Sequence, residues 1–139
     1  RGGEGVANEK LIKNLMKVKL PFEPSSLGQV AACAALEDNQ HLIDSIKIND
    51  TEKRKLGAFL NQVNIEYISS ATNFLTLKFN SSDTAKQFYS DLLKKGIILR
   101  NLESFGLPEC VRVTVGASSE NSMLIENIKK LEFLNVHDR

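Results

Sequence analysis

The sequence predicts an α+β domain in which a small, mainly antiparallel sheet carries helices packed on one face. Up to residue 62 the chain has helical composition, and from Ile65 onward its apolar residues follow the two-residue period of strands. The second part contains two strand pairs, each followed by one amphipathic helix, in the order ββαββα. Short strand pairs that alternate with helices favour an antiparallel sheet covered by those helices.

The length of 139 residues suits a single compact domain with one core. Lysine and arginine total 18 against 17 acidic residues, and a net charge of +1 gives no strong field for nucleic acid or an anionic membrane. The longest apolar runs, such as Val30–Leu36, are much shorter than a bilayer span, and the first residues do not resemble a signal peptide. We therefore expect a cytoplasmic protein that binds neither nucleic acid nor membrane.

The cysteines and histidines give no sign of a metal or redox site. Cys33 and Cys110 stand alone, so we expect two buried, reduced thiols rather than a disulfide or zinc ligands. His41 and His137 lack an acid or metal-ligating partner at a recognisable spacing and receive no role. No Ser-His-Asp set or carboxylate pair emerges, so no catalytic residue is predicted.

Residues 1–7 open without an initiator methionine and carry three glycines, which is typical of the interior of a loop and strand. We therefore expect the chain to be a piece of a longer protein. Arg1 with Gly2 and Gly3 could form part of an anion-binding loop, because glycine lets the backbone approach a phosphate closely. A glycine cluster at a chain end is more often simply flexible.

Two helices are predicted before residue 39. Asn8 caps the first helix, Pro21 and Pro24 end it, and Ser25 or Ser26 caps the second. The apolar face of the first helix is formed by Leu11, Ile12, Leu15 and Met16. The second helix is rich in small residues, so we expect it to pack closely against another backbone.

Residues 39–62 are helical in composition but weakly amphipathic, with apolar residues near both ends and a polar centre from Lys47 to Lys55. We predict one long, partly solvated helix. The alternative is a pair of helices broken near Asn49-Asp50, with Asp50 or Thr51 as the second cap.

Ile65–Ile68 and Phe74–Phe79 are predicted as the strands of a hairpin joined by a polar turn. Ser81 or Ser82 then caps a helix, and Gly96 ends it. The apolar residues of this helix recur at helical spacing and are Ala85, Phe88, Tyr89, Leu92 and Leu93.

The second strand pair is predicted at Ile97–Leu102 and Cys110–Val115, across a loop with a glycine and a proline. Ser118 or Ser119 caps the final helix. The apolar face of that helix is formed by Leu124, Ile125, Ile128 and Leu131.

Arg112 is unusual because it lies inside a strand of β-branched residues. It alternates with Val111, Val113 and Val115, so it occupies the opposite face of the sheet. The simplest interpretation is a solvated arginine, since polar residues commonly occupy the outer face of antiparallel strands. The functional interpretation is a guanidinium that binds a carboxylate or phosphate through two donors, which lysine cannot reproduce.

Arg100 has the same two interpretations. It ends an apolar strand immediately before a long loop, and loop edges are where ligand-binding groups are usually presented. An arginine stays ionised and is costly to bury unpaired, so both positions indicate a fixed anionic partner. That partner could be a ligand.

A set of short segments carries a family resemblance over nearly the whole chain. The segments are Arg1–Glu9, Pro21-Phe22, Ala35–Asp38, Ala71–Phe74, Gly96–Arg100, Ser104–Pro108 and Val111–Gly116 followed by Glu120-Asn121. In this order and spacing they closely resemble the C-terminal portion of histidinol-phosphate aminotransferases, which are pyridoxal-phosphate aminotransferases of fold type I.

The resemblance implies roles for three arginines. The residue that matches Arg112 pairs with the α-carboxylate of the substrate, and the one that matches Arg100 helps to bind the phosphate of histidinol phosphate. The residue that matches Arg1 contacts the phosphate of the pyridoxal phosphate cofactor. Glu4 stands where the family usually has an aromatic residue, and Asn101 stands where proline is frequent.

The resemblance also implies a division of the chain. Residues 1–7 would be a remnant of the large domain, 8–38 the connecting helices, and 39–139 the small α+β domain. The Schiff-base lysine and most of the cofactor site of the family lie upstream of Arg1, outside this sequence. We therefore expect the chain alone to be inactive, and the intact enzyme to be a homodimer. Four lysines of this chain lie on predicted polar faces, so they cannot take the place of the Schiff-base lysine, which needs a desolvated site: Lys10, Lys13, Lys53 and Lys94.

Alternatives to histidinol-phosphate transamination remain open at this point. The parent protein could be an aminotransferase for another amino acid, or a threonine-phosphate decarboxylase, which shares the same phosphate and carboxylate recognition. The complete ββαββα order and the missing lysine also suit a freestanding, non-catalytic binding module.

Overall fold

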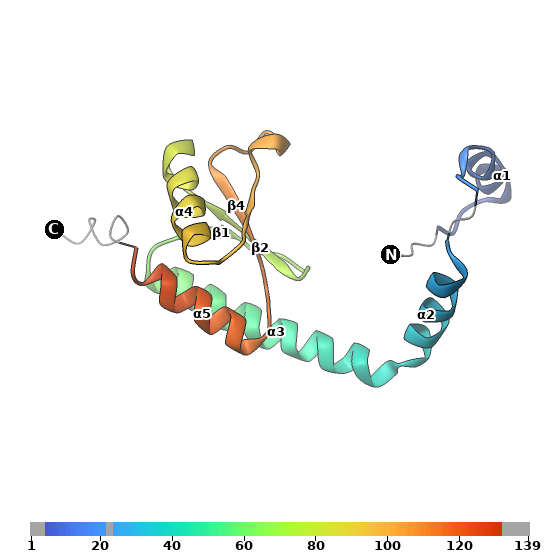
Figure 1. Cartoon of the computed structure of the whole chain (residues 1–139), viewed down its shortest axis with the longest axis horizontal. Coiled ribbons are helices and arrows are strands. Elements are labelled where there is room, and N and C mark those ends of the chain that lie inside the picture. The colour runs from blue at the N-terminus through green and yellow to red at the C-terminus, as the bar shows by residue number, and fades with distance from the viewer. Residues whose placement is uncertain (1–4, 22–23, 132–139) are drawn as a thin grey trace. The chain divides into compact units, whose positions relative to one another are not determined.

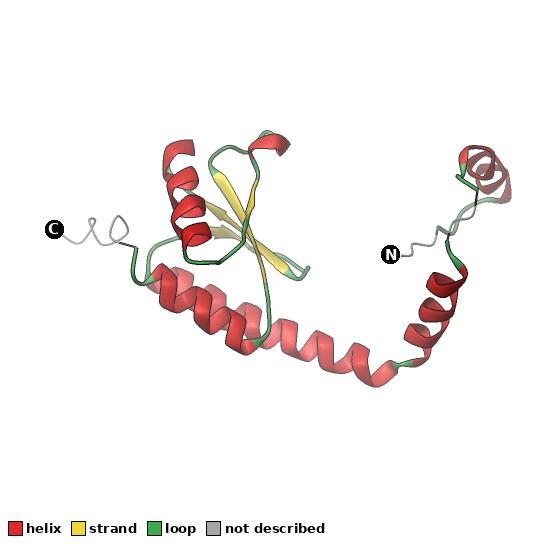
Figure 2. Cartoon of the chain, in the orientation of Figure 1, coloured by secondary structure: helices red, strands yellow, loops and turns green. Residues whose placement is uncertain are grey.

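The structure is a computed structural model, and it describes residues 5–21 and 24–131. Figures 1 and 2 show its helices and strands. The helices are α1 (Glu9–Val18), α2 (Ser26–Glu37), α3 (Asn39–Gln62), α4 (Ser82–Lys94) and α5 (Ser118–Ile128). The strands are β1 (Glu66–Ile68), β2 (Phe74–Lys78), β3 (Arg100–Asn101) and β4 (Cys110–Thr114).

Residue contacts divide the chain into two units, Arg1–Ile43 and Asp44–Arg139. In the first unit, α1 and α2 begin at the predicted caps, and neither helix contains a buried residue. Asn8 Oδ1 accepts a hydrogen bond from the backbone N–H of Lys10 at 2.9 Å. Ser25 Oγ accepts one from Gly28 N–H at 3.2 Å. The assignment of 1–7, 8–38 and 39–139 to parts of a larger enzyme stays a prediction.

The helix α3 runs without interruption through Asn49-Asp50, which confirms the single-helix prediction. Its buried residues are confined to the C-terminal half, where apolar residues recur at helical spacing. They are Glu52, Leu56, Gly57, Phe59 and Leu60. This half of α3 therefore belongs to the core of the second unit.

The second unit is built on a four-stranded antiparallel sheet with the strand order β1-β2-β4-β3. Leu75 and Leu77 of β2 and Val111 and Val113 of β4 are at most 2% exposed. They pack in one hydrophobic cluster with residues of α3, α4 and α5. The α+β class, with helices on one face of a small antiparallel sheet, is confirmed (Figure 2).

The helix α4 matches its prediction at both ends. Ser81 Oγ accepts a hydrogen bond from Thr84 N–H at 3.1 Å, and Gly96 adopts a φ of 80° after the last turn. This left-handed conformation favours glycine, which explains why the helix stops there.

Two predictions about the rest of the second unit are wrong. The strand predicted at Ile97–Leu102 is reduced to Arg100–Asn101, because Ile97 N–H is used by the carbonyl of Leu92 in the helix terminus. Neither Ser118 nor Ser119 caps α5; its N-cap is Ala117, whose N–H donates to Glu120 Oε2 at 2.7 Å.

A further prediction, that both cysteines are buried, is wrong for Cys33 in the first unit. Cys33 is exposed, because no residue of α2 is buried, whereas Cys110 is buried as predicted. Both thiols are free. Burial raises the pKa of the Cys110 thiol, which makes it a poor nucleophile.

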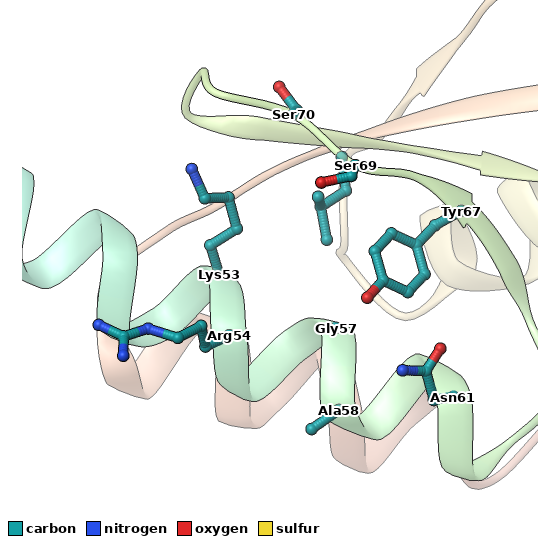
Figure 3. Close-up of a pocket in the computed structure, with 9 residues that line it drawn as sticks. Lys53, Arg54, Gly57, Ala58, Asn61, Tyr67, Ser69 and Ser70 are labelled. Atoms are coloured by element: carbon teal, nitrogen blue, oxygen red, sulfur yellow. The ribbon is translucent and has the colours of Figure 1, made fainter.

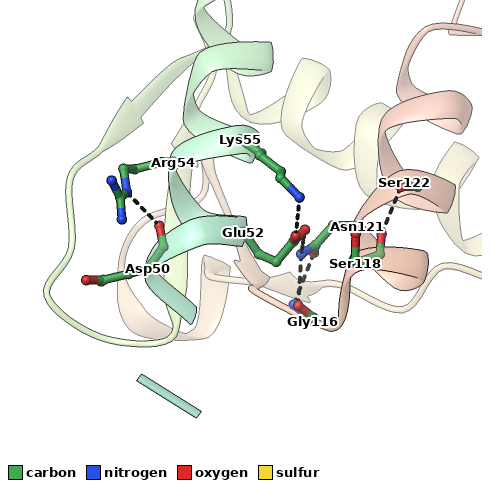
Figure 4. A network of polar contacts seen from close by, with 8 residues as sticks. All are labelled: Asp50, Glu52, Arg54, Lys55, Gly116, Ser118, Asn121 and Ser122. Carbon is green, nitrogen blue, oxygen red and sulfur yellow. Dashed lines mark hydrogen bonds and ion pairs between the residues drawn. The ribbon is translucent and has the colours of Figure 1, made fainter. Parts of the chain in front are cut away.

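A buried polar network connects α3, α5 and the segment after β4 (Figure 4). The carboxylate of Glu52 accepts from Lys55 Nζ at 2.6 Å and from Asn121 Nδ2 at 3.1 Å. Asn121 also bonds both backbone polar groups of Gly116, at 2.9 Å and 3.0 Å. The hydrogen bonds from Lys55 and Asn121 lower the pKa of Glu52, because they stabilise its charged form.

No helix in the ranges 5–21 and 24–131 combines the length and apolar character needed to cross a membrane. Within the same residues, no group of histidine, cysteine and acidic side chains is arranged to hold a metal ion.

Candidate functional site

The two predicted site arginines of the second unit are direct neighbours across the sheet. In the antiparallel pair of β3 and β4, Arg100 is the register partner of Arg112. Residues that are directly opposite in such a pair point to the same face, with Cβ atoms about 4.5–5.5 Å apart. The sequence placed both residues near one loop, and the strand register brings them side by side.

This arginine pair lies on the face of the sheet that the helices do not cover. On its other side Arg112 faces Thr76 of β2, which is only partly buried, and Thr114 further along β4 is exposed. The alternation predicted for β4 is therefore confirmed, since its valines face the core and Arg112 faces away.

Each arginine is held against an aromatic ring. The Cζ atom of Arg112 lies 5.0 Å from the ring centroid of Phe74, and that of Arg100 lies 5.5 Å from the ring centroid of Phe105. Such cation–π contacts orient a guanidinium without neutralising its charge. These contacts hold the two guanidinium groups on neighbouring strands, Arg112 on the inner strand β4 and Arg100 on the edge strand β3.

The arginine pair has no acidic partner among the described residues. None of the ion pairs in this part of the chain involves Arg100 or Arg112. The Nε of Arg112 is also buried without a hydrogen-bond acceptor in the same ranges. Two adjacent like charges repel each other, and a buried unsatisfied N–H costs about 1–3 kcal/mol. An oxyanion bound to the pair would relieve both costs.

The loop after β3 positions Phe105 beside Arg100. Glu103–Phe105 forms a short 3₁₀ helix, which starts with a hydrogen bond of 2.7 Å from Glu103 N–H to Asn101 Oδ1. The loop is tied to α4 by an ion pair of 2.9 Å between Lys86 and Glu103, and this contact raises the pKa of Lys86. Gly106 follows with a φ of 77°, a conformation that favours glycine.

Arg1 and Lys53 are the other two residues with a sequence prediction that bears on the site. Arg1 lies outside the described residues, so its role stays a prediction. Lys53, predicted on a polar face, lies among polar residues, but its side chain is only 17% exposed, because Nζ donates to the carbonyl of Thr72 in the β1–β2 turn at 3.2 Å.

The aromatic partners Phe74 and Phe105 were not predicted from the sequence. Phe74 begins a predicted strand and Phe105 lies in the predicted loop, and neither position by itself indicates an arginine neighbour. A signal was present in principle, because Phe74 and Arg112 occupy the same face if β2 and β4 are paired. That pairing joins strands that are far apart in the sequence, so it could not be read locally.

Comparison with known proteins agrees with this architecture. The chain is 38% identical over 131 residues to a histidinol-phosphate aminotransferase of Campylobacter hominis and covers 36% of that protein. It is also 38% identical over 131 residues to histidinol-phosphate aminotransferase 1 of Bacillus cereus and covers 35% of it. In both cases 94% of this chain is matched, so the chain spans only about a third of the length of these relatives.

Solved structures share the fold. The histidinol-phosphate aminotransferase of Clostridium acetobutylicum superimposes with a TM-score of 0.80 at 22% identity, over 93% of this chain and 39% of that one. The enzyme of Sinorhizobium meliloti, solved in complex with pyridoxal-5'-phosphate, gives a TM-score of 0.75 at 23% identity, over 85% of this chain and 34% of that one. The family model described as aminotransferase class I and II matches residues 1–131. This chain therefore belongs to the class I and II aminotransferases, a family that depends on pyridoxal phosphate.

Proposed function

We propose that this chain is the C-terminal part of a histidinol-phosphate aminotransferase, which transfers an amino group between glutamate and imidazole-acetol phosphate. The observation that carries the proposal is the Arg100–Arg112 pair on the open face of the sheet, without an acidic partner in the described ranges. Relatives that are 38% identical over most of the chain support the choice of substrate.

Arg112 is the proposed site for the α-carboxylate of the amino donor. The guanidinium is planar and presents parallel N–H donors, which match the two oxygens of a carboxylate. Its stacking on Phe74 fixes the plane of the group before the substrate arrives. A preoriented donor loses less entropy on binding, which favours both affinity and a single substrate orientation.

Arg100 is the proposed site for the phosphate of histidinol phosphate. It is exposed at the end of β3, next to the loop that carries Phe105. Histidinol phosphate carries a phosphorylated hydroxymethyl group where glutamate carries its α-carboxylate, so its phosphate extends further from the amino-bearing carbon than the carboxylate does. The two arginines should therefore act on different substrates, Arg112 mainly on glutamate and Arg100 mainly on the phosphorylated substrate.

The proposed activity requires pyridoxal phosphate as cofactor. Pyridoxal phosphate, when bound, supplies the electron sink of transamination. We place the lysine that attaches it upstream of Arg1, and we assign to Arg1 a contact with the cofactor phosphate. Among the described residues Lys53 is well covered, but it lies on the helical side of the sheet, away from the arginine pair. It therefore does not replace the missing lysine, and the chain alone should be inactive.

Steady-state kinetics of the intact enzyme test the arginine roles. Arg112→Ala should raise the KM for glutamate by about tenfold or more, and Arg100→Ala should raise the KM for histidinol phosphate by a similar factor. Lys94→Gln, which removes an exposed positive charge on α4, is the control. An Arg112→Ala enzyme that keeps its KM for glutamate would contradict the assignment.

A threonine-phosphate decarboxylase is the second candidate, and one observation favours it. The arginines are direct cross-strand neighbours, so they suit a substrate with phosphate and carboxylate on the same small molecule. In that case each variant would weaken the binding of the same compound. Substrate profiling of the intact enzyme separates this decarboxylase, and other amino-acid aminotransferases, from the proposed activity.

A further inference from the structure

A polar pocket lies on the opposite face of the sheet from the arginine pair, between α3 and the β1–β2 hairpin (Figure 3). Leu75 contributes to its wall and belongs to the helix-covered face, whereas the next residue, Thr76, faces Arg112. The pocket has a volume of about 370 Å³, within the range of roughly 300–1,000 Å³ that is usual for small-molecule sites. The polar residues that line it are Lys53, Arg54, Asn61, Tyr67, Ser69 and Ser70.

Two cations of α3 reach this pocket, and one carboxylate is close to them. Lys53 Nζ donates to the Thr72 carbonyl at 3.2 Å and lies 3.8 Å from Asp50 Oδ1, which is a loose ion pair. Arg54 Nε donates to the backbone carbonyl of Asp50 at 3.1 Å, so this bond leaves its charge uncompensated. The local charge therefore favours an anion, and the reduced exposure of Lys53 weakens screening by solvent.

Several donors in the same pocket are unused. The Tyr67 hydroxyl, the Asn61 amide and the Ser69 hydroxyl form no hydrogen bond within residues 5–21 and 24–131. Figure 3 shows the Tyr67 ring extending toward Gly57 of α3 and Ser69 above it, whereas the guanidinium of Arg54 points away from both. Asn61 lies on α3, Tyr67 on β1 and Ser69 in the turn that follows β1, so the donors reach the pocket from both of its sides.

Gly57 makes room for one of these donors. A Cβ at this position would lie 2.7 Å from the Tyr67 hydroxyl oxygen, which is closer than a carbon atom can approach without displacing it. The lack of a side chain at Gly57 thus lets the phenol lie directly over the backbone of α3.

We propose that this pocket binds a small oxyanion, either a phosphate or a carboxylate group. Lys53 supplies a charged donor, Arg54 adds positive charge at the wall of the pocket, and the hydroxyls of Ser69 and Tyr67 supply neutral donors. Charge-assisted hydrogen bonds to oxyanions are the strongest that such side chains form. The inference does not depend on the proposed transamination, because it uses residues on the other face of the sheet.

Titration of the 139-residue chain with inorganic phosphate, followed by NMR at constant ionic strength, tests this site. The backbone amide signals of Gly57, Ser69 and Ser70 should shift and saturate, whereas chloride should leave them unchanged. A parallel titration with acetate distinguishes the ligand class. Saturation by phosphate alone assigns a phosphate-bearing ligand, and saturation by acetate assigns a carboxylate. Failure of both anions to give a saturable shift at these amides overturns the proposal.

Variants separate this pocket from the arginine pair. Lys53→Gln should weaken phosphate binding at Ser69 and Ser70 by about tenfold, because it removes a charge-assisted donor. Lys94→Gln and Arg112→Gln should leave the midpoint at these amides unchanged. An unchanged midpoint in Lys53→Gln, or a lost response in Arg112→Gln, would show that phosphate acts elsewhere.

A second variant covers the case in which Lys53→Gln disturbs the β1–β2 turn. Tyr67→Phe removes one hydroxyl that has no partner in the described ranges, so the fold should be retained. Loss of that neutral donor should weaken phosphate binding by a few-fold. If Tyr67→Phe keeps the wild-type midpoint while Lys53→Gln is unfolded, the proposed pocket is rejected.

Discussion

Asn121 Nδ2 donates a hydrogen bond of 3.1 Å to Glu52 Oε2. This bond joins α5 to α3 through two residues that are 69 positions apart in the chain. Both residues are buried, at 3% and 5% exposure. The second proton of the same amide binds Gly116 O, and Asn121 Oδ1 accepts from Gly116 N–H. One side chain therefore fixes the exit of β4 against both α3 and α5.

Asn121→Ala should destabilise the second unit. The change leaves a buried carboxylate oxygen and two backbone groups of Gly116 without their partner, and each such loss costs about 1–3 kcal/mol when water cannot replace it. The free energy of unfolding in urea measures the effect. Ser122→Ala on the exposed side of α5 is the control, since Ser122 Oγ bonds only the carbonyl of Ser118 in the described part of the chain. An Asn121→Ala protein as stable as Ser122→Ala would show that the network contributes nothing.

Glu52 predicts a pH dependence of stability. Its pKa is lowered below the ordinary value of 4.5, chiefly by the hydrogen bonds from Lys55 and Asn121. A carboxyl whose pKa is lower in the folded state stabilises the fold above its unfolded pKa. This contribution is lost as the pH falls through the folded pKa. Relative to Glu52→Gln, the wild-type protein should therefore lose stability below about pH 4.5.

Urea unfolding of wild type and Glu52→Gln at a series of pH values measures this difference. Glu66→Gln is a suitable control, because Glu66 is an exposed residue in a long surface ion pair of 3.7 Å with Lys78. Stability curves of wild type and Glu52→Gln that stay parallel from neutral pH into the acid range would rule out the Glu52 contribution.

The sequence was sufficient for the parts of the fold that depend on local chemistry. The caps at Asn8, Ser25 and Ser81 and the stop at Gly96 follow from hydrogen bonds and backbone geometry within a few residues. The length of β3 was wrong because its pairing is set by β4, which lies across a loop. The pattern of apolar residues in Ile97–Leu102 does not show how many of them pair with β4.

The candidate site was predictable in its residues but not in its geometry. Arg100 and Arg112 stood out because charged residues rarely interrupt apolar strands, and the family resemblance gave them roles. Their direct opposition depends on strand register. The low exposure of Lys53 likewise depends on its hydrogen bond to Thr72, a residue 19 positions later in the chain that the hairpin places next to α3. Contacts of this kind are non-local, and a sequence pattern does not contain them.

Because Arg100 and Arg112 are directly opposite each other in the strand pair, we expect their mutual repulsion to lower the stability of the chain when no anion is bound. Arg100→Gln removes a like charge directly across the strand pair, which at low salt should stabilise the isolated chain by about 0.2–1 kcal/mol, offset by the loss of the cation–π contact with Phe105. At about 1 M salt the Debye length falls to roughly 3 Å, and the difference from wild type should shrink. Urea unfolding at two salt concentrations measures it. Lys95→Gln, on an exposed residue at the end of α4, should show no such salt-dependent gain. A gain that is equal for both variants would argue against repulsion within the pair.

Gly57→Ala tests the close approach of Tyr67 to α3. Alanine is favoured over glycine in a helix by about 1 kcal/mol, so an open position would gain stability. Here the new Cβ would meet the Tyr67 hydroxyl oxygen at 2.7 Å and Cζ at 3.2 Å. Overpacking of this kind costs about 1–3 kcal/mol. We expect a net loss in the free energy of unfolding.

The double variant Gly57→Ala/Tyr67→Phe identifies the cause of that loss. Phenylalanine lacks the oxygen that the Cβ meets first, so part of the stability lost in Gly57→Ala should return, although the ring edge still has to shift. Ala58→Gly, at the neighbouring exposed position of the same helix, reports the helix propensity alone and should cost about 1 kcal/mol. If adding Tyr67→Phe restores nothing, the loss arises from the helix backbone and the phenol is not held by Gly57. A full double-mutant cycle gives the coupling energy between the two positions, and a coupling near zero would exclude direct contact between them.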